Sequence, residues 1–443
     1  MTWEITGDSE RIFHHSPNQS CTIRQNNSAL IGETHGPQEF IQRENNRAAL
    51  SRTLPQMSFS RSRNERQCAH NKIEMSKRIL ITGGAGFIGS HVADELLESG
   101  YTVRVFDSLA PQVHGPERNR PTYLNSEVEL LLGDVRDERA LSKALEGVDA
   151  VYHFAAMVGV GQSMYEIAQY TSVNNSGTAV LLQQLIKKPV ERLVVASSMS
   201  VYGEGLYQTD EGEIVDGSER GLEQLRKHAW ELTSREGKDL QPIATPETKT
   251  PSLASVYALS KYDQERMSLL IGRAYKMPTV ALRFFNVYGP HQALSNPYTG
   301  VLAIFASQLL NNNAPSIFED GLQRRDFVSV HDVAHACTLA LEVPEAADEV
   351  FNIGSGENFT VREVARRMGA AVNKQIEPEI TGKYRVGDIR HCFSDITKAR
   401  KILGYEPIVS FDEGLEELVN WLEGEVAVDK VTQAKAELAA RGL

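Results

Sequence analysis

The sequence has few cysteines and no long apolar run, and both absences narrow the class of protein. Only four cysteines occur among 443 residues, at Cys21, Cys68, Cys337 and Cys392, without CxxC spacing. A disulfide framework and a cysteine zinc site are therefore not expected, and the scattered histidines predict no metal. No apolar run approaches the roughly 18 residues that span a bilayer. We therefore expect a cytoplasmic protein.

An excess of positive charge is also absent. Acidic residues number 58 and basic residues 46, which gives a net charge of −12. Proteins that bind nucleic acids or anionic membranes carry a basic stripe, so we expect neither partner. The length is that of two or three domains.

Residues 1–74 differ in composition from the rest of the chain. They are rich in Asn, Gln, Ser, Arg and His and show no amphipathic period. So little apolar surface cannot offset the entropy lost on ordering, which predicts disorder. Acidic residues near the start (Glu4, Asp8 and Glu10) count against a transit peptide. An extension without a role is the favoured interpretation, and a regulatory tail is the alternative.

Short apolar runs alternate with helical patterns from Arg78 onwards. This alternation predicts an α/β fold in which a parallel sheet is covered by helices on both faces. The expected strands are 78–82, 103–106, 128–132, 150–154 and 193–196, and the expected helices include 88–98, 138–145 and 176–187. After Tyr288 the alternation loosens, which indicates a smaller region with segments that return to the sheet.

A glycine-rich turn joins the first strand to the first helix. Glycine allows a tight turn and close approach of the backbone to a pyrophosphate, which the helix N-terminus then binds. The context of strand, turn and helix predicts a dinucleotide site, with an ordinary turn as the alternative. The predicted residues are Gly83, Gly86, Phe87, Ile88 and Gly89.

Two aspartates follow the next strands. Asp107 ends the second strand, where its carboxylate can bind both ribose hydroxyls and would repel a 2′-phosphate, so NAD is favoured over NADP. Asp134 and Val135 end the third strand, and the aspartate can reach an adenine there. A turn or helix-cap role for Asp134 is nearly as well supported.

Tyr257 and Lys261 lie one turn apart on the same face of a helix. A free phenol has a pKa of about 10, too high for a base at neutral pH. A neighbouring ammonium and a positively charged nicotinamide ring would favour the phenolate, which makes Tyr257 a candidate general base. For this motif alone, a surface pair is the alternative.

Eight motifs occur along the chain in one order. In these motifs and their order the chain resembles the extended short-chain dehydrogenases/reductases of the nucleotide-sugar epimerase/dehydratase group. The motifs are TGGAGFIG (82–89), GDVRD (133–137), HFAA (153–156), ASSMSVYG (196–203), YALSK (257–261), RFFNVYGP (283–290), RRDFVSVHDVA (324–334) and NIGSG (352–356).

The resemblance implies a Rossmann-type doubly wound sheet and a set of site residues. Ser198 would share the hydrogen bond to the sugar O4 with Tyr257, and Lys261 would also bind the nicotinamide ribose. The other implied cofactor residues are Phe154, Ala155, Ala156, Asn174 and Phe285. The implied substrate residues are Asn286, Arg325 and Arg385 for the diphosphate, Ser316 and Phe318 for the nucleobase, and Asp388 for the ribose. For the later positions, salt bridges or core packing are rival roles.

The resemblance also implies domains and a dimer. Residues 1–74 form the extension, 75–285 a NAD-binding domain with an insert at about 205–245, 286–425 mainly the substrate region, and 426–443 a helical tail. A homodimer is usual in the family. For the insert, which is longer than usual, the alternatives are a cover over the sugar, an interface and a solvated loop, and we expect the loop.

The residues after Ser198 distinguish the chemistries of the group. Dehydratases carry an Asp-Glu pair there, whereas this chain has Met199 and Ser200. Without an acid/base pair for C5, the remaining chemistry of the group is reversible oxidation at C4. We therefore expect a 4-epimerase that acts on a dTDP- or UDP-hexose. Apolar residues at Val158–Val160 favour a 6-deoxyhexose, as used in cell-surface polysaccharides. The alternatives are a dehydratase or reductase of this family and a non-catalytic NAD-binding sensor.

Overall fold

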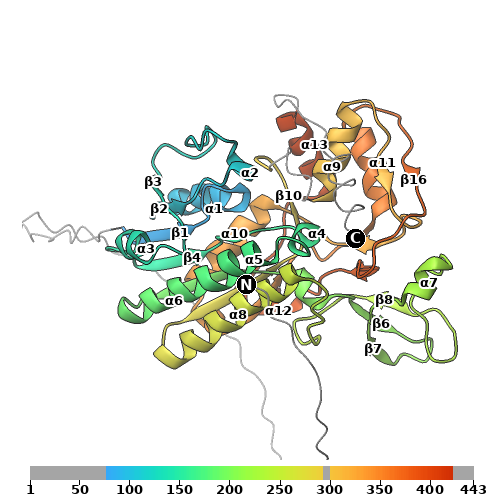
Figure 1. Ribbon diagram of the computed structural model, residues 1–443, viewed down its shortest axis with the longest axis horizontal. Helices are drawn as coiled ribbons and strands as arrows, with labels where there is room; N and C mark the ends of the chain where they lie inside the picture. Colours follow the sequence, from blue (N-terminus) through green and yellow to red (C-terminus); the bar gives the residue numbers. More distant parts are fainter. Residues whose placement is uncertain (1–75, 293–299, 423–443) are drawn as a thin grey trace, which may run out of the picture. The chain divides into compact units, whose positions relative to one another are not determined.

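Seven described strands form one parallel sheet at the centre of the fold (Figure 1). The structure is a computed structural model that describes residues 76–292 and 300–422. The predicted extension at 1–74 and tail at 426–443 lie outside the described residues. In spatial order the strands are β14 (Val350–Ile353), β9 (Thr279–Phe284), β5 (Arg192–Ser198), β4 (Ala150–His153), β1 (Arg78–Thr82), β2 (Thr102–Asp107) and β3 (Glu129–Leu132).

Helices cover both faces of this sheet, as the alternation of strands and helices predicts. Successive side chains of a strand point to opposite faces, so Ile79 and Ile81 join one apolar cluster and Leu80 joins another. Residues of α1 (Phe87–Glu98), α10 (Val330–Glu342) and α12 (Thr397–Leu403) belong to the first cluster. Residues of α3 (Glu138–Ala144), α6 (Gly177–Lys187) and α8 (Val256–Tyr275) belong to the second. The predicted Rossmann-type fold is confirmed.

The elements predicted from the sequence are all present, and their ends differ by one or two residues. Short turns of helix connect several of them. These are α2 (Pro111–His114), α4 (Val160–Ser163), α5 (Ile167–Tyr170), a π-helical turn (Thr171–Ser176) and 3-10 turns at Met199–Tyr202 and Pro344–Ala346.

Beyond β9 the chain builds smaller sheets and a third apolar cluster, and β14 returns to the edge of the main sheet. The strands pair as β10 (Asn286–Tyr288) with β13 (Phe327–Ser329), β11 (Ser316–Ile317) with β16 (Glu379–Ile380), and β12 (Arg324–Arg325) with both β15 (Phe359–Thr360) and β17 (His391–Cys392). The helices here are α9 (Val301–Leu310), α11 (Val361–Ala371) and α13 (Phe411–Leu422).

The insert differs from the solvated loop that we expected. It contains an antiparallel sheet of β7 (Ile214–Asp216), β6 (Leu206–Gln208) and β8 (Gln241–Ile243), together with α7 (Leu222–Arg226). Tyr207, Leu232 and Leu240 form a small buried cluster. The loop prediction is wrong because these apolar residues are too widely spaced to show a strand period but converge once the hairpins form.

Within the described residues, none of the helices has both the length and the apolar character needed to cross a bilayer. The same residues contain no cluster of three or more potential metal ligands, and the described cysteines, Cys337 and Cys392, are buried and unpaired.

His153 ends β4 as a fully buried imidazole between two threonines. Its Nδ1 lies 2.8 Å from Thr82 Oγ1, and its Nε2 lies 2.7 Å from Thr178 Oγ1. Burial, with a smaller contribution from Lys261, lowers the pKa of His153 from 6.5 to about 3. The native protein therefore keeps this ring neutral where the unfolded chain would protonate it.

This difference predicts a pH-dependent stability. Between pH 6.5 and about 4 the unfolded chain binds a proton at His153 that the native state does not. The free energy of unfolding should therefore decrease as the pH is lowered through this range. The contribution is at most ~1.4 kcal/mol per pH unit. Urea unfolding at about pH 7.5 and pH 5 measures the change, and His153→Asn, which retains amide hydrogen bonding, should reduce the slope. Equal slopes in the two proteins would contradict this assignment.

Candidate active site

The glycine-rich turn after β1 has the geometry of an anion cradle. Gly83 has φ +73°, and a Cβ placed on it would lie 2.7 Å from the backbone nitrogen of Ala155. No side chain among the described residues caps the N-terminus of α1, whose N-cap is Gly86. The first N–H groups of α1 are therefore available for a pyrophosphate. Phe87, Ile88 and Gly89 lie in the first turn of that helix.

Asp107 ends β2 beside the same turn and is buried. One carboxylate oxygen accepts a hydrogen bond from Ala85 N at 3.0 Å, and the other accepts one from Leu109 N at 2.8 Å. Tyr123 donates to the carbonyl of Ala85 at 2.9 Å. The structure thus places Asp107 beside the glycine-rich turn, and the two backbone contacts fix the direction of its carboxylate. Binding of a ribose by Asp107 stays a prediction.

Asp134 stabilises a turn, which is the alternative role that the sequence left open. Its carboxylate accepts from Arg136 Nε and from Arg136 N, both at 2.9 Å, and its carbonyl closes a turn to Asp137 N. The hydrogen bonds from Arg136 hold the pKa of Asp134 below its ordinary value. Val135 packs into the apolar core. A contact of Asp134 with an adenine stays a prediction.

The segment after β4 packs against the glycine-rich turn. Phe154 makes an edge contact with Phe284 at 6.1 Å between ring centroids, and Ala155 and Ala156 follow it. Asn174 holds the next residues of this segment, because its side chain accepts from Met157 N at 2.7 Å and donates to Met157 O at 3.1 Å. It also donates to Ser260 Oγ on α8 at 2.9 Å. Asn174 therefore connects the predicted cofactor wall to the helix of Tyr257.

Ser198 and Tyr257 are brought together at the end of β5. The Ser198 hydroxyl lies close enough to Tyr257 to lower the pKa of its phenol, and Ser200 Oγ donates to Ser198 Oγ at 2.9 Å. Ser163 accepts from the backbone N–H of Tyr257 at 3.0 Å, so α4 abuts the start of α8. Lys261 lies one turn further along α8 and is 3% exposed. Ser198 and Tyr257 are half-buried and Lys261 is buried, so all three side chains are at least partly shielded from water.

Burial changes the acidity of this cluster. It raises the pKa of Tyr257, although the hydrogen bond to Ser198 opposes the change. It lowers the pKa of Lys261 to about 7, against the attraction of Glu265. Burial therefore disfavours both charged forms, and the phenolate expected at Tyr257 needs a nearby positive charge.

Gln264 is a neighbour of Lys261 that the sequence analysis missed. Lys261 Nζ donates to Gln264 Oε1 at 2.7 Å, and Gln264 Nε2 donates to Thr178 Oγ1 at 2.9 Å and lies 3.2 Å from His153 Nε2. A buried chain of polar groups thus connects Lys261 to Thr82, the last residue before the turn. The i, i+3 spacing of Lys261 and Gln264 on a helix is the signal that could have revealed it.

Two predicted residues follow β9. Phe285 is buried with Met199, Val201 and Tyr202 beside Ser198. Asn286 begins β10, and its side chain donates to the carbonyl of Asp326 at 2.8 Å. Both therefore lie at the same edge of the sheet as the end of β5.

The remaining predicted residues lie in the C-terminal region. Arg385 places its guanidinium 4.6 Å from the ring centre of Phe318, and Ser316 begins the strand that leads to Phe318. Arg325 donates to the carbonyl of Arg390 at 2.9 Å and also to that of Ile389. Asp388 accepts from Ile389 N at 3.1 Å. Arg325 thus binds the segment that carries Arg385 and Asp388.

Comparison with known proteins identifies the family of this chain. A model of the NAD dependent epimerase/dehydratase family matches residues 79–221 and 233–354. The chain belongs to this family. It is similar to the dTDP-L-rhamnose 4-epimerase of Burkholderia thailandensis, at 36% identity over 79% of this chain and 96% of that protein.

Solved structures of family members agree with the fold. The UDP-glucose 4-epimerase of Thermotoga maritima with UDP-glucose is 32% identical, with a TM-score of 0.64 over 78% of this chain and 98% of that one. The UDP-glucose 4-epimerase of Thermus thermophilus in complex with NAD is 31% identical, with a TM-score of 0.63 over 79% and 100%.

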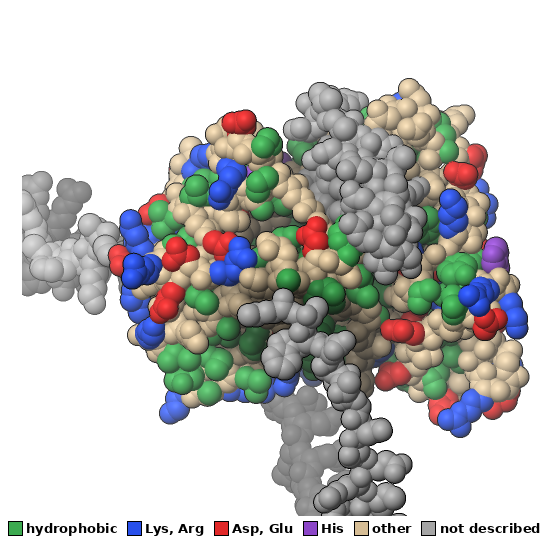
Figure 2. Space-filling view, in the orientation of Figure 1, with side chains coloured by type: hydrophobic (Ala, Val, Ile, Leu, Met, Phe, Trp, Pro, Cys, Tyr) green, Lys and Arg blue, Asp and Glu red, His purple; other side chains and the backbone are tan. Residues whose placement is uncertain are grey.

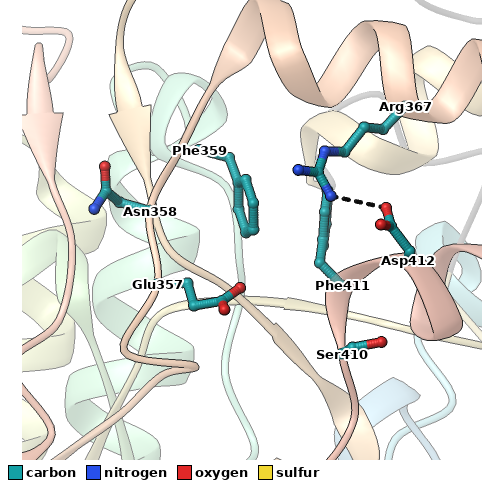
Figure 3. Close-up of a pocket in the computed structure, with 7 residues that line it drawn as sticks. All are labelled: Glu357, Asn358, Phe359, Arg367, Ser410, Phe411 and Asp412. Carbon is teal, nitrogen blue, oxygen red and sulfur yellow. Dashed lines mark hydrogen bonds and ion pairs between the residues drawn. The ribbon is translucent and has the colours of Figure 1, made fainter.

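A separate hollow of about 500 Å³ lies between β15, α11 and α13 (Figure 3). Phe359 and Phe411 stack there at 4.6 Å, and Arg367 lies over Phe359 and pairs with Asp412 at 2.9 Å. None of the predicted site residues, all of which are described, lines this hollow. Because its arginine is already paired with a carboxylate, we assign the stack to the packing of α11 on α13.

For a family member with this geometry, Tyr257→Phe should retain NAD but lower turnover by roughly 10²-fold or more, since a general base is lost. Tyr262→Phe is the matched control, because Tyr262 lies on the same helix but packs against the cluster of Met199, Val201 and Tyr202. Steady-state turnover and the NAD content of the purified proteins measure both. Near-full activity of Tyr257→Phe would contradict the catalytic assignment.

Asp107→Asn should reduce the preference for NAD over NADP, because the charge that repels a 2′-phosphate disappears while one backbone contact can be kept. Dissociation constants of both dinucleotides, measured by titration calorimetry, test this expectation. Glu129→Gln, at the exposed end of the adjacent strand β3, is the control and should leave the ratio unchanged. An unchanged ratio in Asp107→Asn would place the selectivity elsewhere.

Proposed function

We propose that this protein is an NAD-dependent nucleotide-sugar 4-epimerase. The observation that carries the proposal is that Ser198 lies close to Tyr257, while Lys261, one turn further along α8, is connected by buried polar groups to the residue before the glycine-rich turn. Met199 and Ser200, which follow β5, carry no carboxylate. The named activities of the relatives from Burkholderia and Thermotoga are also 4-epimerisations.

The residues of the turn fit a dinucleotide. Gly83 and Gly89 have no room for a side chain, because a Cβ would meet backbone atoms at 2.7 Å and 2.6 Å respectively. Together with the uncapped start of α1 and the Asp107 carboxylate, this geometry suits a pyrophosphate and a ribose. Bound NAD would take a hydride from C4 of the sugar and return it to the opposite face.

Tyr257 at the start of α8 and Ser198 at the end of β5 handle the proton of the sugar O4. Tyr257 takes this proton as the C4 carbonyl forms and gives it back when the alcohol is restored, while Ser198 holds the oxygen by a second hydrogen bond. Because burial raises the pKa of Tyr257, the positive charges of the nicotinamide and of Lys261 are needed to favour the phenolate.

The local carboxylate cannot act at C5. Glu265 is fully buried, and it accepts from Ser197 Oγ at 2.7 Å and from Arg283 through two nitrogens at 2.9 and 2.7 Å. A carboxylate held by three hydrogen bonds is not a free base. Met199 and Ser200 offer no replacement, which supports epimerisation over dehydration.

Apolar side chains beside Tyr257 support a 6-deoxyhexose. Val158 is 53% exposed and Val160 is 51% exposed, and Val160 begins the helical turn whose Ser163 binds the backbone of Tyr257. A methyl group at C6 would bury against such side chains, whereas a 6-hydroxyl would lose hydrogen bonds to water. A role in cell-surface polysaccharide synthesis and a cytoplasmic location stay predictions.

The surface of α8 supports the expected homodimer. Leu259, Leu270 and Tyr275 are 47%, 56% and 50% exposed on this helix, and Figure 2 shows apolar side chains gathered over it. Exposed apolar side chains on one helix are typical of a surface that a second copy covers.

Isotope exchange distinguishes the proposal from its alternatives. In heavy water, the epimerised product should carry no deuterium at C4 or C5, because the hydride returns from the cofactor to the same carbon. No net NADH and no keto-deoxysugar should accumulate. Nuclear magnetic resonance and mass spectrometry of a panel of dTDP- and UDP-hexoses measure these outcomes.

Deuterium at C5 or loss of water from C6 would instead indicate a dehydratase or a 3,5-epimerase. Net NADH would indicate a dehydrogenase, and binding without turnover a sensor. The inactive Tyr257→Phe variant gives the background exchange.

A further inference from the structure

The part of the insert that the family model does not match contacts the predicted substrate segment. The matched stretches, 79–221 and 233–354, leave out residues 222–232, which contain α7 and the turn that follows it. Figure 1 shows α7 and the sheet of β6, β7 and β8 on the same side of the fold as β16. Side chains of Trp230 and Glu231 reach residues 384–391, as the following contacts show.

Arg390 is the centre of these contacts. Its guanidinium is fully buried and donates to Asp320 through two nitrogens, at 2.7 and 2.9 Å, and to Glu319 at 3.0 Å. Both carboxylates belong to the turn after β11. The third partner is Glu231 of the insert, which also lies 2.9 Å from His391 Nε2. Glu231 thus binds two consecutive residues at the end of the substrate segment.

A second buried arginine fixes the backbone of the same segment. Arg220 donates to the carbonyl of Asp388 at 2.9 Å and pairs with Glu319 at 2.8 Å. Glu204, just before the insert, accepts from the backbone N–H groups of Arg390 and His391. Side chains from the insert region therefore bind consecutive peptide groups between residues 388 and 391.

Such a network is better suited to fixing geometry than to adding stability. Removing charges from water costs several kcal/mol per ion, which the attraction between them only partly offsets. Glu231 is nevertheless charged. Burial would raise its pKa, but the hydrogen bonds from His391 and Arg390 outweigh burial and lower the pKa to about 2. The charge of Glu231 is thus constant over the physiological range.

The segment held in this way carries residues predicted to bind the nucleotide diphosphate. Arg385 lies over Phe318, and Arg325 donates to the carbonyls of Ile389 and Arg390. From the insert, the ring centre of Trp230 lies 6.2 Å from that of Tyr384, the residue before Arg385. The insert and the predicted diphosphate arginines therefore contact the same short stretch of chain.

We propose that residues 222–232 form a positioning element, in which Glu231 and Trp230 hold segment 384–391 so that Arg385 and Arg325 can bind the diphosphate of the nucleotide sugar. This inference rests on the proposed function, because it takes a nucleotide sugar as the ligand. Glu231 and Trp230 act through other residues and are positioning residues.

Glu231→Gln is the direct test, because it removes the charge and keeps the shape. We expect the KM for the nucleotide sugar and the Kd for free UDP or dTDP to rise by about 10- to 100-fold, the effect of misplacing a binding group. The kcat value and the NAD content should stay within about twofold, because the Tyr257 cluster is not part of this network. Glu231→Asp should restore part of the affinity.

Glu223→Gln is the matched control. Glu223 lies in the same segment, but its ion pair with Arg226 is exposed, so KM and Kd should not change. If Glu231→Gln does not fold, as judged by circular dichroism, Trp230→Leu must raise KM and Kd in its place. An unchanged KM in the folded variant, or a lower kcat with unchanged KM, would overturn the inference.

The two proposals fail in different ways. If the unaltered protein binds neither UDP nor dTDP and epimerises no nucleotide hexose, the proposed function is wrong. If the unaltered protein does both and the variants match it, only the positioning role is wrong.

Discussion

All seven strands of the central sheet run in the same direction, and the candidate site depends on that constraint. The carboxyl ends of parallel strands meet at one edge, where ligands of doubly wound sheets bind. The glycine-rich turn after β1, the Phe154 segment after β4 and Ser198 at the end of β5 therefore come together although they are far apart in sequence. Burial of the side chains at this edge also changes their acidity, because it lowers the pKa of Lys261 to about 7 and raises the pKa of Tyr257.

Sequence reasoning predicted the parts of this arrangement that depend on local pattern. Apolar strands buried on both faces read as continuous runs, and the turn at Gly83–Gly86 and the spacing of Tyr257 and Lys261 lie within single elements. Asp134 shows the limit of this reasoning. Its partner, Arg136, is two residues away, so the turn role could have been preferred from the sequence alone.

The insert could not have been predicted in the same way. Glu231 and its partner Arg390 are 159 positions apart, and nothing local distinguishes this glutamate among 58 acidic residues. Its buried cluster, Tyr207, Leu232 and Leu240, consists of apolar residues separated by polar stretches. A long-range ion pair needs both chain segments to be held next to each other by the fold. Its two partners therefore cannot be recognised from a local sequence pattern.

The two halves of the candidate site are therefore built by different means. The predicted dinucleotide half uses backbone groups and glycines of one turn, which lie close together in sequence. The predicted nucleotide-sugar half uses side chains from β12, the turn after β11 and segment 384–391, which must be held in place across the chain. The family model ends at residue 354, before Arg385 and Asp388, and also omits 222–232. If the proposed function is right, binding of the nucleotide sugar depends on side chains outside the part that the family model matches, where the insert and segment 384–391 meet.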